Sequence, residues 1–159
     1  MRMNEGVEWA AHVCVLLHWL DEGGLTPVPA SRLAESYDLP AAYLGKQVQA
    51  LARAGITESL PGRGGGIRLA RPASRITLMD VVAAIEGGTD AFACTEIRQR
   101  GMNAGNPRTE YTKPCGIAHA MRSAELAWRR ELATTSIADL AAATPTRTAD
   151  AARRHFSTA

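Results

Sequence analysis

The 159-residue sequence predicts a mainly α-helical fold, in which a winged helix-turn-helix domain is followed by a long C-terminal dimerisation helix. Three observations predict it. Apolar residues recur at helical spacing in four segments of the first ninety residues, and two short alternating segments flank a glycine-rich turn between the third and the fourth of them. One long amphipathic stretch lies beyond this small domain.

The first three helices are expected in the order helix, short helix, turn, helix. Apolar residues at spacings of three and four predict a helix over about 7–20, and a second helix of about two turns follows over 31–37. Pro40 suits the start of the next helix, which we place at about 41–53. It stops at Gly55, where a left-handed backbone conformation is easy only for glycine.

A β-hairpin and a further helix complete the predicted DNA-binding domain, residues 1–88. Residues 56–70 predict the wing, because two alternating segments flank the turn Pro61-Gly62-Arg63-Gly64-Gly65. Thr77 with Asp80 three residues later predicts a helix start, since the hydroxyl can accept a backbone N–H and the carboxylate favours the positive end of the helix dipole.

Beyond residue 88 the sequence predicts a loop over 89–115, a dimerisation helix with a short docking helix over 116–143, and a loose tail over 144–159. A single apolar stripe marks the long helix: Ile117, Met121, Ala124, Trp128 and Leu132. Such a helix outside a small domain is typical of an oligomer interface. Ser136 and Asp139 repeat the capping pattern before the docking helix.

Charge is distributed unevenly along the chain. The net charge is +2 overall, yet residues 1–29 carry −3 and residues 30–75 carry +4. A basic segment of this kind predicts a phosphate-binding face. No run of about eighteen apolar residues is present, and three cysteines form no disulfide framework. We expect a cytoplasmic protein that does not act at a membrane.

The helix over 41–53 is expected to enter the major groove of DNA by its amino-terminal end. The residues it would present are Ala41, Ala42, Tyr43, Lys46 and Gln47. Lys46 and Gln47 can read base edges, and the alternative is a solvated helix face. In the wing, Arg63 among glycines can approach a narrow minor groove, and Arg68 adds non-specific affinity. A flexible glycine turn is the alternative for the wing.

Cys94 and Cys115 bracket a polar loop that gives little reason to bury a thiol. Two cysteines do not saturate a metal centre, because iron-sulfur and structural zinc sites need about four protein ligands. Cys14 lies in the apolar stripe of the first helix, so we expect it to be a core residue. Glu8 and His12 share one helix face and can converge on one ion, although such a pair is also typical of a solvated surface.

Several segments resemble the IscR, NsrR and RsrR family of bacterial winged-helix repressors. They are Tyr43-Leu44, LARAGI at 51–56, GRGGGIRLAR at 62–71 and ITLMDVV at 76–82. The similarity covers about residues 5–142. It implies a homodimer that binds a near-palindromic double-stranded DNA operator, with an iron-sulfur cluster in many members. Three closely spaced cysteines are usual in the cluster loop of the family, and this chain departs from that pattern.

Within the family, the RsrR-type redox regulators are the most similar in three segments: GVEWAAH at 6–12, FACTEIRQRG at 92–101 and KPC at 113–115. That resemblance implies a 2Fe-2S cluster held by Cys94 and Cys115 of one subunit with Glu8 and His12 of the other. It also implies a cluster whose redox state switches DNA affinity. Trp9, next to Glu8, is expected to pack near the site.

Other interpretations keep the same fold. Zinc accepts two cysteines, a histidine and a glutamate, and the cysteines alone can form a thiol switch; a nitric oxide sensor is a further alternative. We expect no enzymatic activity, because His18, His119 and His155 have no partner at catalytic spacing. The glycine run at 62–66 also lacks the Lys-Ser/Thr of a P-loop.

Overall fold

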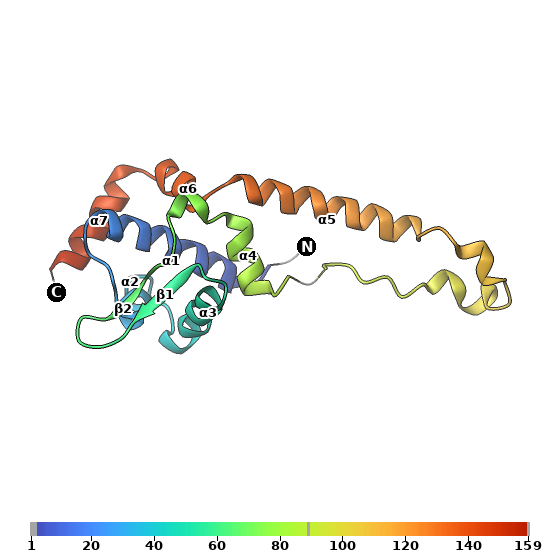
Figure 1. The fold of residues 1–159 in the computed structure, drawn as a ribbon, viewed down its shortest axis with the longest axis horizontal. Coiled ribbons are helices and arrows are strands. Elements are labelled where there is room, and N and C mark those ends of the chain that lie inside the picture. The colour runs from blue at the N-terminus through green and yellow to red at the C-terminus, as the bar shows by residue number, and fades with distance from the viewer. Residues whose placement is uncertain (1–2, 89, 159) are drawn as a thin grey trace.

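The computed structural model describes residues 3–88 and 90–158. Figure 1 shows a lobe of packed helices from which a long arm projects. The lobe contains α1 (Glu5–Glu22), α2 (Ala30–Ser36), α3 (Ala41–Arg53), β1 (Thr57–Leu60), β2 (Gly66–Leu69), α4 (Leu78–Glu86), α6 (Ile137–Ala143) and α7 (Thr146–Ser157). The arm consists of residues 90–115 and α5 (Gly116–Thr134). The mainly α, winged helix-turn-helix fold predicted from the sequence is confirmed.

Helix α1 is the centre of the lobe, since α3, α4, α6 and α7 all pack against it. Its inward stripe is fully buried: Ala10, Val13, Cys14, Leu17 and Leu20. Cys14 is therefore the core residue that the apolar stripe predicted, and burial raises the pKa of its thiol to about 12. This thiol stays protonated and behaves as a small hydrophobe.

The wing is an antiparallel hairpin in which Thr57 pairs with Leu69 and Leu60 pairs with Gly66. Between the strands, Gly62 and Gly64 adopt φ angles of 91° and 80°, which side chains other than glycine rarely tolerate. A bridge from Val28 adds a further pairing to the hairpin through Ile67. Helix α3 and the hairpin thus lie at the residues where the sequence predicted the third helix and the wing.

Both predicted helix starts are capping boxes. The Thr77 hydroxyl accepts the Asp80 N–H while the Asp80 carboxylate accepts the Thr77 N–H, and Ser136 and Asp139 repeat the arrangement at α6. Thr77 and Ser136 also pair as an isolated β-bridge. These contacts join the starts of α4 and α6 at the point where the chain re-enters the lobe after α5. Ile137, the next residue, is fully buried.

The prediction of a loose tail over 144–159 is wrong, because residues 146–157 form helix α7 on the surface of α1. Ala149 and Phe156 are buried there, and the Arg153 guanidinium donates to the Trp19 carbonyl at 3.0 Å and to the Glu22 carboxylate at 2.8 Å. Long-range contacts of this kind order a segment whose own composition is marginal for a helix.

The arm leaves most of α5 without a neighbour in the chain. Glu125 is the one buried residue of α5, while large apolar side chains are exposed, with Ile117 at 67%, Met121 at 44% and Leu126 at 47%. Nineteen helical residues carry the beginning of α5 about 28 Å from its end. The far end of the arm is therefore remote from the lobe of its own chain (Figure 1).

Candidate functional site

The two arm cysteines are neighbours at the start of α5, where the two limbs of the loop meet. Cys115 is the N-cap residue of α5, and Cys94 lies on the incoming limb with its side chain near that of Cys115. The backbone N–H groups of Ala118 and Ile117 point at the Cys115 sulfur and, with smaller help from Arg98, hold the pKa of that thiol below its usual value. Cys94 is exposed and Cys115 is half-buried.

An ion pair accompanies the cysteines. The Arg98 Nε donates to the Glu96 carboxylate at 2.7 Å, which lowers the pKa of Glu96. The Glu96 Oε1 also lies 3.9 Å from the Cys94 sulfur. Arg98 and Glu96 were not singled out from the sequence, although their position in the matching segment 92–101 offered a signal.

Glu8 and His12 lie on the exposed face of α1, as their spacing predicted, and are therefore in the lobe rather than in the arm. One chain does not bring them to the cysteines. Among the described residues, 3–88 and 90–158, no three His, Cys, Asp or Glu side chains converge as a metal site. A four-ligand site from these residues requires a second chain.

The same face of α1 touches the helix-turn-helix. The Trp9 ring packs edge-on against Tyr43 of α3, with centroids 5.6 Å apart, and the His12 ring lies 5.9 Å from the Tyr37 ring. The Tyr37 hydroxyl donates to the His12 carbonyl at 3.3 Å. The Trp9 ring, next to Glu8 in sequence, thus connects α1 to α3, and His12 connects α1 to the end of α2.

Helix α3 presents an exposed face opposite its buried residues. Ala41 and Ala42 are exposed in its first turn, Tyr43 is 54% exposed, and the Lys46 ammonium lies 5.3 Å from the Tyr43 ring centroid. The predicted base-contacting side chains other than Gln47 therefore reach the surface of α3.

The Gln47 amide turns toward the amino end of α1 instead. It is half-buried, and it lies so close to Gly6 that a Cβ there would be 2.7 Å from it. Two residues not singled out from the sequence, Gln49 and Arg53, are exposed at positions three and seven beyond Lys46. Their spacing of three and seven residues from Lys46 places Gln49 and Arg53 on the same helix face, and this spacing could have predicted them from the sequence.

The wing arginines differ in their surroundings. Arg63 is exposed at the tip of the hairpin. Arg68 pairs with Glu58 across the strands at 2.7 Å, so part of its charge is neutralised. Arg63 is accordingly the wing cation best placed to approach a phosphate backbone.

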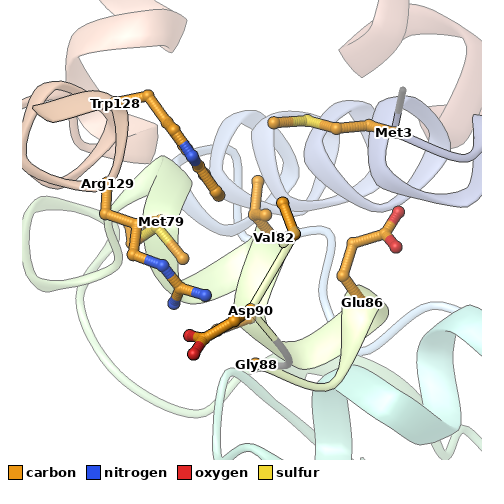
Figure 2. Close-up of a pocket in the computed structure, with 10 residues that line it drawn as sticks. Met3, Met79, Val82, Glu86, Gly88, Asp90, Trp128 and Arg129 are labelled. Atoms are coloured by element: carbon orange, nitrogen blue, oxygen red, sulfur yellow. The ribbon is translucent and has the colours of Figure 1, made fainter. Parts of the chain in front are cut away.

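A buried carboxylate anchors the root of the arm. Glu125, 8% exposed, accepts from the Ala91 N–H at 3.2 Å and from the Arg129 guanidinium at 2.7 Å. A cavity of about 240 Å³ lies beside it between α4 and α5. Figure 2 shows Met3 and Trp128 on one side of this cavity and the Asp90 carboxylate near Arg129 on the other. The cavity belongs to the arm root rather than to the cysteine pair.

The part of the chain that the structure describes has no helix long and apolar enough to cross a membrane.

Comparison with known proteins identifies the family. The model of the Rrf2 family, described as an iron-dependent transcriptional regulator, matches residues 3–143. This chain belongs to the Rrf2 family. It is thus a helix-turn-helix transcriptional regulator, and regulators of this fold bind DNA, commonly as dimers.

Individual relatives agree in sequence and in fold. Protein aau3 of Rhizobium meliloti (strain 1021) is 36% identical over 146 residues, which cover 91% of this chain and 88% of that protein. CymR, the global cysteine regulator of B. subtilis, is similar in structure with a TM-score of 0.66 at 21% identity, covering 91% of this chain and 99% of that one. IscR of T. potens gives a TM-score of 0.58 at 20% identity, covering 88% and 85%.

The two structural relatives establish the likeness of fold. Because the Rrf2 family is one of transcriptional regulators, it agrees with the expectation that this chain is not an enzyme. The family model also describes its members as iron-dependent, and thiolates such as those of Cys94 and Cys115 are common iron ligands.

Proposed function

We propose that this protein is a homodimeric repressor whose operator affinity is switched by the redox state of a 2Fe-2S cluster shared between subunits. Cys94 and Cys115 of one subunit would hold the cluster with Glu8 and His12 of the partner subunit. The observation that supports this proposal is that the Cys94 and Cys115 side chains are neighbours at the start of α5, in the arm, while the candidate carboxylate and imidazole are exposed on α1, in the lobe.

The donor set fits such a cluster. Thiolates are the usual ligands of iron-sulfur iron, and the pKa of Cys115 is already lowered by the α5 backbone N–H groups. An imidazole replacing a thiolate makes the site less negative, which raises the reduction potential. When bound, the cluster would supply a centre that gains and loses one electron.

A second copy of the chain is the partner that the arm requires. Ile117 and Met121 are exposed apolar side chains four residues apart on one face of α5, and a second copy of the chain would cover them. Two arms that cross along this surface would carry the cysteines of each chain toward the lobe of the other. Symmetric dimers of this kind bury the same patch on both subunits.

Coupling to DNA follows from the contacts of α1. Glu8 and His12 lie on the exposed face of α1, and the half-buried Trp9, which follows Glu8 in sequence, contacts Tyr43 of α3. A change of charge at the ligands would alter how α1 sits against α3, and with it the spacing of the two recognition helices across a near-palindromic operator.

A thiol-only switch is a second candidate, and the proximity of the Cys94 and Cys115 side chains favours it. Zinc at the same four ligands and nitric oxide sensing by the cluster are further alternatives. The anaerobic visible spectrum, together with iron, sulfide and zinc contents, distinguishes the cluster, the thiol-only switch and zinc. A coloured protein with iron and sulfide supports the cluster, and a colourless one contradicts it. Exposure of the coloured protein to nitric oxide then tests the last.

The decisive variants are Cys94→Ala and His12→Ala, each compared with His119→Ala, an exposed histidine on α5. Both ligand variants should lose most iron and sulfide, whereas His119→Ala should retain them. Operator binding is then measured by anisotropy with oxidised and with dithionite-reduced protein. Equal affinities of the two states would contradict the switch.

A further inference from the structure

Arg98 joins the two limbs of the arm beside the cysteine pair. Its guanidinium NH2 donates to the Lys113 carbonyl at 2.6 Å, across fifteen positions of sequence. Arg98 is four residues after Cys94, and Lys113 is two residues before Cys115. This hydrogen bond therefore fixes the separation of the limbs that carry the thiols.

Other contacts hold the guanidinium in place. Its Nε pairs with Glu96 at 2.7 Å, and its centre lies 5.3 Å from the centroid of the Tyr111 ring. The backbone is fixed as well, because the Asn103 amide donates to the Arg98 carbonyl at 3.1 Å. The Arg98 side chain is 28% exposed, so this charge has one defined position rather than a mobile one.

The charge lies near both sulfur atoms. Arg98 interacts electrostatically with Cys94 and with Cys115, and it does so from inside the turn that they bracket. Glu96 neutralises part of the charge, but its side chain is the more exposed of the pair at 41%. Because Arg98 is the less exposed of the two, solvent screens its charge less than that of Glu96.

We propose that Arg98 is a positioning residue for the cysteine pair, holding the two thiols together and favouring the reduced state of the cluster by its charge. This role rests on the proposed function. Reduction adds one negative charge at the site, and a fixed cation beside the sulfur ligands stabilises that charge. Neighbours that orient ligands and tune a centre in this way are general in metal sites.

The electrostatic role is tested by redox titration of the holoprotein. Arg98→Gln should lower the midpoint potential, with a tenfold change in the ratio of oxidised to reduced protein corresponding to a 59 mV shift for one electron. Arg98→Lys keeps the charge and should stay near the native potential. Arg100→Gln, which removes the same charge from an exposed position two residues on, is the matched control. Equal shifts in Arg98→Gln and Arg100→Gln would overturn the assignment.

The positioning role is tested without the cluster. Dibromobimane becomes fluorescent when it bridges two neighbouring thiols, and the buried Cys14 does not compete for it. Anaerobic apoprotein should give a lower bridging yield in Arg98→Gln than in the native chain or in Arg100→Gln. An unchanged yield overturns the positioning role, even where the variant has lost its cluster and no potential can be measured.

The two proposals fail differently. Native protein purified anaerobically without iron and sulfide would overturn the proposed function and with it the role of Arg98 in tuning. Native protein that carries the cluster, together with an Arg98→Gln variant of unchanged potential and bridging yield, would overturn the assignment of Arg98 alone.

Discussion

The Trp9 indole packs edge-on against the Tyr43 phenol, with ring centroids 5.6 Å apart and planes at 70°. One ring belongs to the helix that carries Glu8 and His12, and the other projects from the recognition helix. Aromatic pairs of this geometry contribute about 0.5–1.5 kcal/mol beyond their buried area. The pair is thus a direct contact between the helix that carries the candidate ligands, α1, and the helix predicted to enter the major groove, α3.

Trp9→Ala should weaken the coupling between redox state and operator affinity. Loss of the ring contact removes up to about 1.5 kcal/mol, so the ratio of the two affinities should fall by as much as roughly tenfold. Anisotropy titrations of oxidised and reduced protein measure the ratio. Tyr43→Phe keeps the ring and should preserve it; an unaltered ratio in Trp9→Ala would exclude this contact from the coupling.

Two substitutions should separate base reading from phosphate binding. Lys46→Ala should cost about 1–3 kcal/mol on the cognate operator and less on altered sequences, because its effect depends on a base edge. Arg63→Ala should weaken binding to all sequences alike and reduce the salt slope by about 0.9. Salt-dependent anisotropy on cognate and scrambled duplexes distinguishes them. A sequence-independent loss for Lys46→Ala would remove it from base reading.

Local sequence signals predicted much of this fold. The capping boxes at Thr77 and Ser136, the end of α3 at Gly55 and the burial of Cys14 all follow from residues within one or two helical turns. Helix α7 was missed because it depends on distant partners: the Arg153 guanidinium donates to the Trp19 carbonyl, 134 positions away in sequence. No local pattern carries that information.

In the candidate site too, local sequence predicted some features, and others depend on how distant segments pack. The spacing of Glu8 and His12 placed them on one exposed face, but the direction of Gln47 depends on how α3 packs against α1, which a helical period does not specify. Arg98 was missed because its contact across the arm, the Lys113 carbonyl, lies on the other limb, fifteen positions away in sequence. The exposure of Cys94 was predictable from the polarity of the loop around it, whereas Cys115 is half-buried at the start of α5.

Glu125→Gln should destabilise the arm root. The carboxylate accepts from the Ala91 N–H and from Arg129 in a nearly buried position, and hydrogen bonds to charged groups contribute about 1.5–3 kcal/mol. We expect the free energy of unfolding to fall by about 2 kcal/mol in urea titrations. Glu131→Gln, exposed on the same helix, should change it little. Equal effects would contradict an anchoring role for Glu125.

The cap of α6 predicts an acid-dependent loss of stability. Hydrogen bonds from the Ser136 hydroxyl and backbone N–H hold the pKa of Asp139 below its usual value near 3.8. A carboxyl whose folded pKa is depressed stabilises the fold fully above its unfolded pKa and loses that contribution as pH falls through the folded value.

Asp139→Asn should therefore be less stable than the native chain at neutral pH, and the difference should shrink below pH 3.8. Urea midpoints of both proteins across the acid range provide the measurement. A difference that stays constant at every pH would show that the carboxylate charge contributes nothing to the cap.

The shared site is tested most directly by mixing subunits. One subunit carries Cys94→Ala with Cys115→Ala, the other carries Glu8→Ala with His12→Ala, and differently tagged mixed dimers are purified. Ligands drawn from both chains leave one intact site in each mixed dimer and none in either parent dimer. We predict half of the native iron, sulfide and visible absorption in the mixed dimer and almost none in the parents. A mixed dimer as empty as its parents would contradict a cluster shared between subunits.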